Sequence, residues 1–261
     1  KTVLPFGDSP PDDVRRRANF PLNLSNGVPS PPFGFKNFNK SGLVICSSPG
    51  KSGEPSEYFA IGGSFFSRQH KHADDMGFQL FSGGKGIFTD AGTFSYQYEN
   101  PERIFVESTR AHNCLEIDEY DYSRFMADVF GNCIDIAEKL GDAIFVDGTI
   151  NRSRLIPSDL PYNKVKGIDC VSVQIKQRRM AYYVPGKFLV IVDDITSKDE
   201  RTYTQWFNLF PGLQISNSEN DWLISDNEEV LAVVRTLDGG PAEFVHRKGQ
   251  DNPRLEGWIS P

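Results

Sequence analysis

The sequence predicts an all-β fold, a large antiparallel two-sheet β-sandwich of the supersandwich kind that follows an irregular N-terminal connector. From about residue 42 onward, short apolar or alternating runs recur, and turns containing Gly or Pro separate them. Aromatic residues make up 12% of the chain, and they favour the pleated surface of a sheet. No convincing amphipathic helix follows residue 42, which argues against folds that alternate helices with strands. The predicted strands are 43–46, 58–61, 78–81, 86–89, 114–117, 143–146, 171–175, 188–192, 203–210 and 230–234.

The first part of the chain differs from the rest. Residues 1–41 contain many of the 17 prolines and show little periodicity, so we expect a connector there. Within it, segment 11–17 could form one or two helical turns, with acidic residues first and basic residues last. Residues 42–261 are expected to form the sandwich domain. The chain starts at Lys1 and shows no hydrophobic targeting stretch, so we interpret it as a piece of a larger protein.

Composition limits the partners of the protein. The net charge is -7, which argues against nucleic acid because phosphate binding needs a basic face. A few local cations could still bind an acidic sugar. No apolar run is long enough to span a bilayer. The four cysteines form no CxxC pair, so we expect small buried side chains, or one disulfide, in place of a zinc–thiolate site. They are Cys46, Cys114, Cys133 and Cys170.

Two histidines at positions 70 and 72 form an HxH pair. On a strand, residues two apart point to the same face, so His70 and His72 would face one way and Lys71 the other. Neutral imidazole is a common ligand for zinc. The pair therefore supplies two metal ligands, or one ligand and one acid/base group. Taken alone, the same pattern fits polar surface equally well.

Three segments in order carry a family resemblance. They read SRQHKHADD at 67–75, GIFTDAGTFSY at 86–96 and STRAHNCLEID at 108–118. Together they resemble the SxxHxHxD, DxGTxxY and SxxAHNT patterns of heparinase II/III-like proteins and the related alginate lyases. The resemblance covers roughly residues 40–260 and implies the C-terminal β-sandwich domain of such a protein. Each pattern alone is weak, and their order makes the signal specific.

The resemblance implies a metal site. His72, Asp90 and His112 would hold a divalent cation, Zn²⁺ or alternatively Ca²⁺, in a structural role that positions the loop carrying His70. Other interpretations stay open at each position. His72 and His112 could be core histidines, Asp90 could cap a turn, and Asp74 is a rival third ligand if the strand continues through it.

The resemblance also implies residues that face the substrate. His70 would face the sugar and help neutralise a uronate carboxylate, and one tyrosine, Tyr96 or Tyr98, would lie near it. Arg110 could reach the substrate as well. The alternatives are that the tyrosines are packing residues and that Arg110 pairs with a nearby acid.

The implied activity is that of a polysaccharide lyase acting on a uronic-acid glycan by β-elimination. The reaction needs a base for the proton at C5, an acid for O4 and a group that neutralises the carboxylate. Imidazole, phenol and guanidinium groups are suitable. The resemblance implies a bacterial protein that is periplasmic or secreted, with an acidic polysaccharide as its partner.

Relatives place a helical (α/α) toroid before the sandwich, and that toroid supplies a catalytic Asn or His and a Tyr. Nothing in this sequence encodes it, and residues 1–41 look like its end and the connector. We therefore expect this piece to bind metal and to show little or no turnover alone. The alternative functions are a non-catalytic, metal-containing carbohydrate-binding or structural sandwich and a protein of surface-polysaccharide biosynthesis.

Overall fold

The computed structural model confirms the all-β prediction. The structure describes residues 33–50, 55–66, 70–122, 131–161, 170–218, 221–237, 243–249 and 256–257. Within these ranges the strands form antiparallel sheets of five, seven, three and two strands. The helical turns predicted at 11–17, and most of the expected connector, lie outside the described residues.

The five-stranded sheet forms one wall of the sandwich, in the order β1-β2-β3-β5-β6. β1 pairs with β2 along its whole length, although it falls in the range expected to be connector. The sheet therefore begins before the boundary drawn at residue 42. The strands are β1 (Gly34–Phe38), β2 (Leu43–Pro49), β3 (Pro55–Gly62), β5 (Gly77–Ser82) and β6 (Lys85–Phe88).

The seven-stranded sheet forms the facing wall, in the order β13-β12-β11-β8-β7-β14, with β10 paired to β11. Buried and outward residues alternate along β12, as they must in a strand with one face on the core. The strands are β7 (Leu115–Ile117), β8 (Tyr120–Tyr122), β10 (Ile134–Leu140), β11 (Ala143–Pro157), β12 (Val171–Val184), β13 (Phe188–Ser197) and β14 (Tyr203–Gln205).

The predicted strand at 203–210 is mostly absent. Only its first three residues form β14, which pairs with β7. Two smaller sheets complete the described fold, namely β15 (Gln214–Ser218), β16 (Asp221–Asp226) and β17 (Glu229–Arg235), and the pair β4 (Ser64–Phe65) and β9 (Gly131–Asn132). The short 3-10 helices are η1 (Asn39–Ser41) and η2 (Thr109–Ala111).

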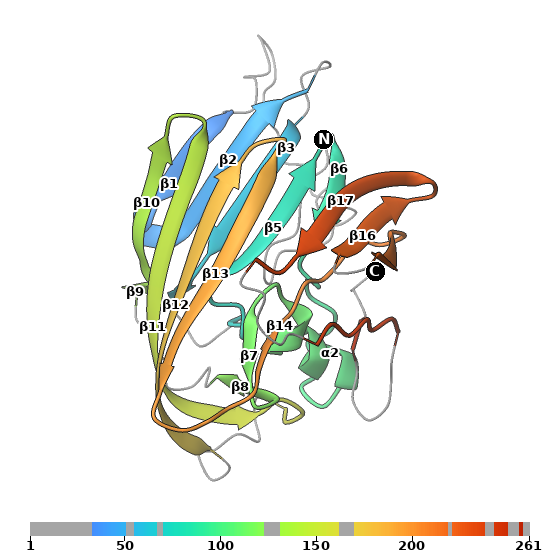
Figure 1. Cartoon of the computed structure of the whole chain (residues 1–261). Helices are drawn as coiled ribbons and strands as arrows, with labels where there is room; N and C mark the ends of the chain where they lie inside the picture. Colours follow the sequence, from blue (N-terminus) through green and yellow to red (C-terminus); the bar gives the residue numbers. More distant parts are fainter. Residues whose placement is uncertain are drawn as a thin grey trace, which may run out of the picture.

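A six-residue helix, α2 (Pro101–Val106), also forms where no helix was expected. The side chain of Asn100 accepts a hydrogen bond from the Arg103 backbone N–H at 2.9 Å, and Pro101 occupies the first turn. This is the usual chemistry of a helix start. Figure 1 shows α2 beside β7 and β14, at one end of the two large sheets.

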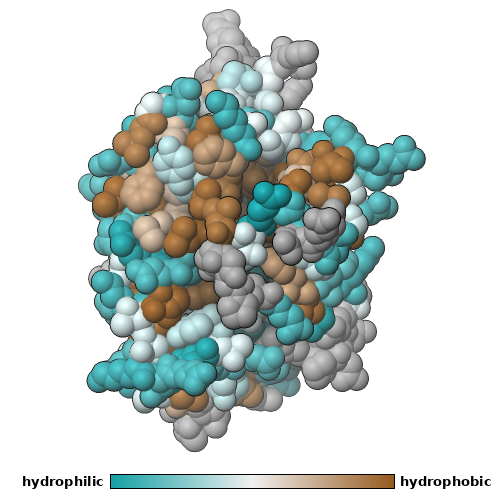
Figure 2. Space-filling view, viewed as in Figure 1, coloured by the Kyte–Doolittle hydropathy of each residue, from teal (hydrophilic) through white to brown (hydrophobic). Residues whose placement is uncertain are grey.

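The core lies between the two large sheets. Phe59 of β3 and Tyr183 of β12 meet across it with ring centroids 4.9 Å apart, and the surrounding core cluster is apolar. The outward face of the β12–β13 hairpin is mixed, with exposed apolar side chains such as Phe188 and Val192 among polar ones (Figure 2). The described residues include no helix long and apolar enough to cross a membrane.

The four cysteines are free thiols and mostly buried, as expected for small core side chains, and they form no disulfide. Cys46, Cys114 and Cys133 are buried, and Cys170 is half-buried. Burial raises the pKa of the Cys114 and Cys133 thiols to about 12 each, so these side chains behave as small apolar groups.

Candidate functional site

The HxH pair does not lie on a strand, and that prediction is wrong. Residues 70–76 form an irregular turn before β5, and His70 has the left-handed φ of 61°. The Ala73 backbone N–H donates to the Glu107 carbonyl at 2.9 Å, which draws this segment towards α2 and away from a sheet. Both histidines nevertheless line one pocket. His70 is exposed at its surface, whereas His72 is buried.

Lys71 points into the protein between two carboxylates. Its ammonium group donates to Asp74 and, at 2.7 Å, to Asp75. Burial alone would lower the pKa of Lys71, but the two carboxylates outweigh it and raise that pKa. Asp75 also pairs with Arg152 at 3.1 Å. Asp74, the rival metal ligand, is thus held by Lys71.

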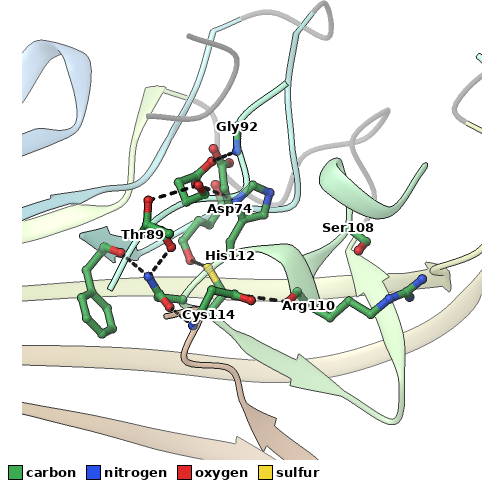
Figure 3. Close-up of polar contacts among 12 residues, drawn as sticks. Asp74, Thr89, Gly92, Ser108, Arg110, His112 and Cys114 are labelled. Atoms are coloured by element: carbon green, nitrogen blue, oxygen red, sulfur yellow. Dashed lines mark hydrogen bonds and ion pairs between the residues drawn. The ribbon is translucent and has the colours of Figure 1, made fainter. Parts of the chain in front are cut away.

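Asp90 and His112 are joined directly. Asp90 Oδ2 lies 2.7 Å from His112 Nδ1, and Asp90 Oδ1 accepts a hydrogen bond from the Gly92 backbone at 2.8 Å. Gly92 has a φ of 75°, which glycine adopts without strain. Burial would lower the pKa of His112, but Asp90, and then Asp74, outweigh it and raise that pKa. Figure 3 shows His112 and Asp74 close together at this end of the sandwich.

The three predicted metal ligands lie together. The rings of His72 and His112 are 5.4 Å apart between centroids, and Asp90 is bonded to His112. In the described part of the chain, no group of three or more His, Cys, Asp or Glu side chains converges enough to hold an ion as it stands. Within the same ranges, His112 Nε2 is buried and has no hydrogen-bond partner. Two imidazoles and a carboxylate suit Zn²⁺ in kind, although the three side chains do not converge on one point in this arrangement.

A buried network supports this cluster from behind. The Asn113 side-chain amide donates to the carbonyls of Phe78, at 2.7 Å, and Thr89, at 2.9 Å. Arg179 of β12 donates to the carbonyls of Met76 and Asn113 at 3.1 and 2.7 Å. One guanidinium therefore ties the segment that carries His72 to the segment that carries His112.

Arg179 is fixed in turn by a carboxylate on the next strand. Its Nε and Nη2 groups donate to the two oxygens of Asp193, on β13, at 2.8 and 2.7 Å. Both side chains are almost fully buried. The fork geometry of this pair fixes the orientation of the guanidinium.

The pocket beside this cluster is open to solvent. The rings of His70 and Tyr96 meet edge to face there, with centroids 6.1 Å apart, and Tyr96 is 73% exposed. Of the two tyrosines left open by the sequence, only Tyr96 lines the pocket, whereas Tyr98 packs under Arg103 at 4.3 Å from its ring centroid. The lining residues are His70, His72, Thr93, Phe94, Ser95, Tyr96, Arg103, Val106 and Glu107.

Arg110 does not line this pocket. Its side chain is 2% exposed and donates to Asp159 at 2.7 Å, which corresponds to the ion-pair alternative. Figure 3 shows the Arg110 side chain running away from His112. Sequence reasoning missed Arg103 and Glu107, which enter the pocket from α2. The sequence Asn100-Pro101-Glu102 was the available signal, because it is typical of a helix start.

Comparison with protein families finds a match over part of the chain. Residues 30–147 match the family model described as Heparinase II/III-like, C-terminal. Over these residues the chain resembles the heparinase II/III-like C-terminal domain. The match spans the three motif segments, so it covers every candidate site residue named above.

The chain is also similar to a curated protein and to solved structures. It is 24% identical over 172 residues to a heparin-sulfate lyase of Bacteroides thetaiotaomicron, covering 65% of this chain and 20% of that protein. The chain thus spans about a fifth of the length of this curated relative. In structure it resembles a heparinase III gene product (TM-score 0.53, 20% identity, 74% and 27% of the two chains). It also resembles the heparan sulfate lyase HepC from Pedobacter heparinus (TM-score 0.53, 15% identity, 74% and 29%). These structures share its β-sandwich fold.

Proposed function

We propose that this chain is the C-terminal part of a polysaccharide lyase that cleaves uronic-acid glycans by β-elimination. The observation that carries the proposal is the open pocket in which His70 and Tyr96 meet next to the buried His72. Imidazole and phenol are proton-transfer groups, and the pocket holds both at the surface. The heparin-sulfate lyase relative supports the same class of reaction.

The reaction requires four coordinated changes on the sugar. A base takes the proton at C5, the electron pair forms the C4=C5 double bond, the C4–O4 bond breaks, and O4 receives a proton. We assign His70 and Tyr96 to the side of the sugar where these protons move. Arg110 is not included among the reacting groups, because its guanidinium is buried against Asp159.

We further propose that His72, Asp90 and His112 hold Zn²⁺. Imidazole ligands favour zinc over Ca²⁺, which prefers oxygen. A bound cation there would supply fixed positive charge and hold the turn that carries His70 next to the pocket. The buried His112 Nε2 atom and the neighbouring His72 ring support the two imidazole ligands.

The proposed cellular location follows from the similarity to the bacterial heparin-sulfate lyase. A bacterial lyase for an extracellular polysaccharide works outside the cytoplasm, so we place this protein in the periplasm or outside the cell. Its partner would be an acidic polysaccharide.

The full-length protein tests the proposed activity. It is incubated separately with heparin, heparan sulfate, alginate and chondroitin sulfate, and the ultraviolet absorbance of the unsaturated uronate is followed. We expect absorbance to rise with at least one glycan, and His70→Ala to slow that reaction by roughly 10²–10⁴-fold. His246→Ala is the control, because His246 is exposed and lies outside the pocket. A flat signal with all four glycans would reject the lyase and favour a carbohydrate-binding role.

Metal analysis tests the ligand set independently of activity. The purified protein, His72→Ala and His246→Ala are compared by elemental analysis after gel filtration. We expect about one zinc per chain in the parent and in His246→Ala, and a loss of zinc in His72→Ala. Equal metal content in all three proteins would remove His72 from the site.

A further inference from the structure

We propose that Arg103 of α2 binds the acidic substituent of the sugar in the pocket, a carboxylate or a sulfate. This inference rests on the proposed function and names the group that selects its substrate. Arg103 lines the pocket together with His70 and Tyr96. Among the described residues that line the pocket, it alone carries a permanent positive charge.

Most N–H donors of the Arg103 guanidinium are available to a ligand. A guanidinium has five N–H donors. The Nε–H donates to Glu107 Oε1 at 2.7 Å. Among the described residues, nothing accepts a hydrogen bond from the Nη1 or Nη2 groups of Arg103. The four remaining N–H donors form the fork that matches a carboxylate or sulfate in two parallel hydrogen bonds.

The guanidinium is held in place before any ligand arrives. Its Cζ atom lies 4.3 Å from the ring centroid of Tyr98, and its side chain is only 14% exposed. Glu107 fixes one edge and the Tyr98 ring supports one face. Binding of an anion therefore costs little conformational entropy of the Arg103 side chain. A partly buried positive charge also attracts an anion more strongly than a fully solvated one.

Two aromatic side chains extend the pocket beyond a simple anion site. Phe94 and Tyr96 line the pocket and are 43% and 73% exposed. Exposed rings next to polar groups are suited to the apolar C–H face of a sugar. The combination of rings, imidazoles and one fixed guanidinium selects an acidic sugar unit over a neutral sugar.

The test uses the full-length protein and the substrate found by the absorbance assay. We expect Arg103→Gln to raise KM by roughly 10-fold to 100-fold, the loss of a charged hydrogen-bond pair, with a smaller change in kcat. Arg103→Lys keeps the charge and should recover part of the affinity. The control Arg235→Gln removes an exposed arginine that pairs with Asp221 on the small sheet, and should leave KM unchanged.

Glu107→Gln separates anion binding from helix stability. If Arg103 served only to pair with Glu107, Glu107→Gln and Arg103→Gln would raise KM equally and lower the melting temperature equally. If Arg103 binds the anion, Glu107→Gln leaves KM near or below the parent value. Equal effects of these two variants, an unchanged KM in Arg103→Gln, or a loss confined to kcat would each overturn the proposal.

The choice of glycan identifies the anion. A rise in KM for both unsulfated and sulfated uronate chains assigns Arg103 to the carboxylate, and a rise for sulfated chains only assigns it to sulfate. Both results support the proposal. If the parent protein cleaves no glycan, the lyase proposal fails, and calorimetric titration with an acidic oligosaccharide still tests Arg103. Equal binding by parent and Arg103→Gln, or no binding by the parent, would then overturn it.

Discussion

The two sides of the candidate site differ in how they are built. On one side, His72, Asp90 and His112 are at most 6% exposed, and each segment that carries them is anchored to the protein interior. On the other side, His70 is exposed, Tyr96 is 73% exposed, and both extend from irregular backbone. The buried side is prearranged by many hydrogen bonds, whereas the open side is available to a ligand.

This difference predicts which mutations should change stability and which should change activity. Buried polar groups are costly to disturb because their partners lose hydrogen bonds that water cannot replace. Exposed groups at a pocket can be changed with little effect on folding, so their effects should appear in binding and rate. Stability and activity should therefore separate along the boundary between the two sides.

Thiol labelling should show the largest contrast. Cys114 follows the buried His112–Asn113 segment, and burial raises its pKa and that of Cys133 to about 12. A raised pKa lowers the thiolate fraction at any pH below it, and thiolate is the reactive form. At pH 8 we expect Cys170, which is half-buried, to react with iodoacetamide at least ~10³-fold faster than Cys114. Peptide mass spectrometry over time measures both rates, and comparable rates would mean that the buried side opens readily.

Removal of the Arg179 tether should have the next largest effect. Arg179→Met leaves the buried Asp193 carboxylate with the Gln205 amide but without its guanidinium partner, and it frees two carbonyls, so we expect a loss of about 3–5 kcal/mol in unfolding free energy. Urea denaturation measures it, with Arg235→Met as the control for an exposed pair. Labelling of Cys114 should accelerate in Arg179→Met. A variant as stable as its control would show that the tether does not support the buried side.

The open side should give the smallest change in stability. Tyr96→Ala removes an exposed ring that meets His70, so we expect the unfolding free energy to change by no more than ~0.5 kcal/mol. Lyase activity in the full-length protein should fall, because the ring lines the proposed sugar pocket. Lower stability without loss of activity would reverse the assignment of Tyr96 to the open side.

Sequence patterns predicted the sandwich well, because strands that bury one face carry their own signal. Each predicted run matches a strand to within one residue except 203–210, where pairing to β7 ends at Gln205. The three motif segments also predicted which side chains gather, namely His72, Asp90 and His112, which lie together.

The backbone around the site was beyond sequence reasoning. The HxH segment leaves the strand conformation because Lys71 turns back onto Asp74 and Asp75 and because Ala73 bonds to Glu107. The second contact links distant parts of the chain, which a local sequence pattern does not encode. Arg103 and Glu107 were missed because α2 has only six residues, too few for a periodic pattern. Arg110 was included because of its neighbours in sequence, and its environment depends on Asp159, 49 positions away.

The left-handed backbone at His70 sets thermal stability against the proposed catalytic role of its imidazole. A φ of 61° suits glycine better than any residue with a side chain. Evolution for heat resistance alone would thus tend to replace His70 with glycine and discard its imidazole. A screen that scores only survival on heating would enrich folded proteins that have lost the proposed reaction.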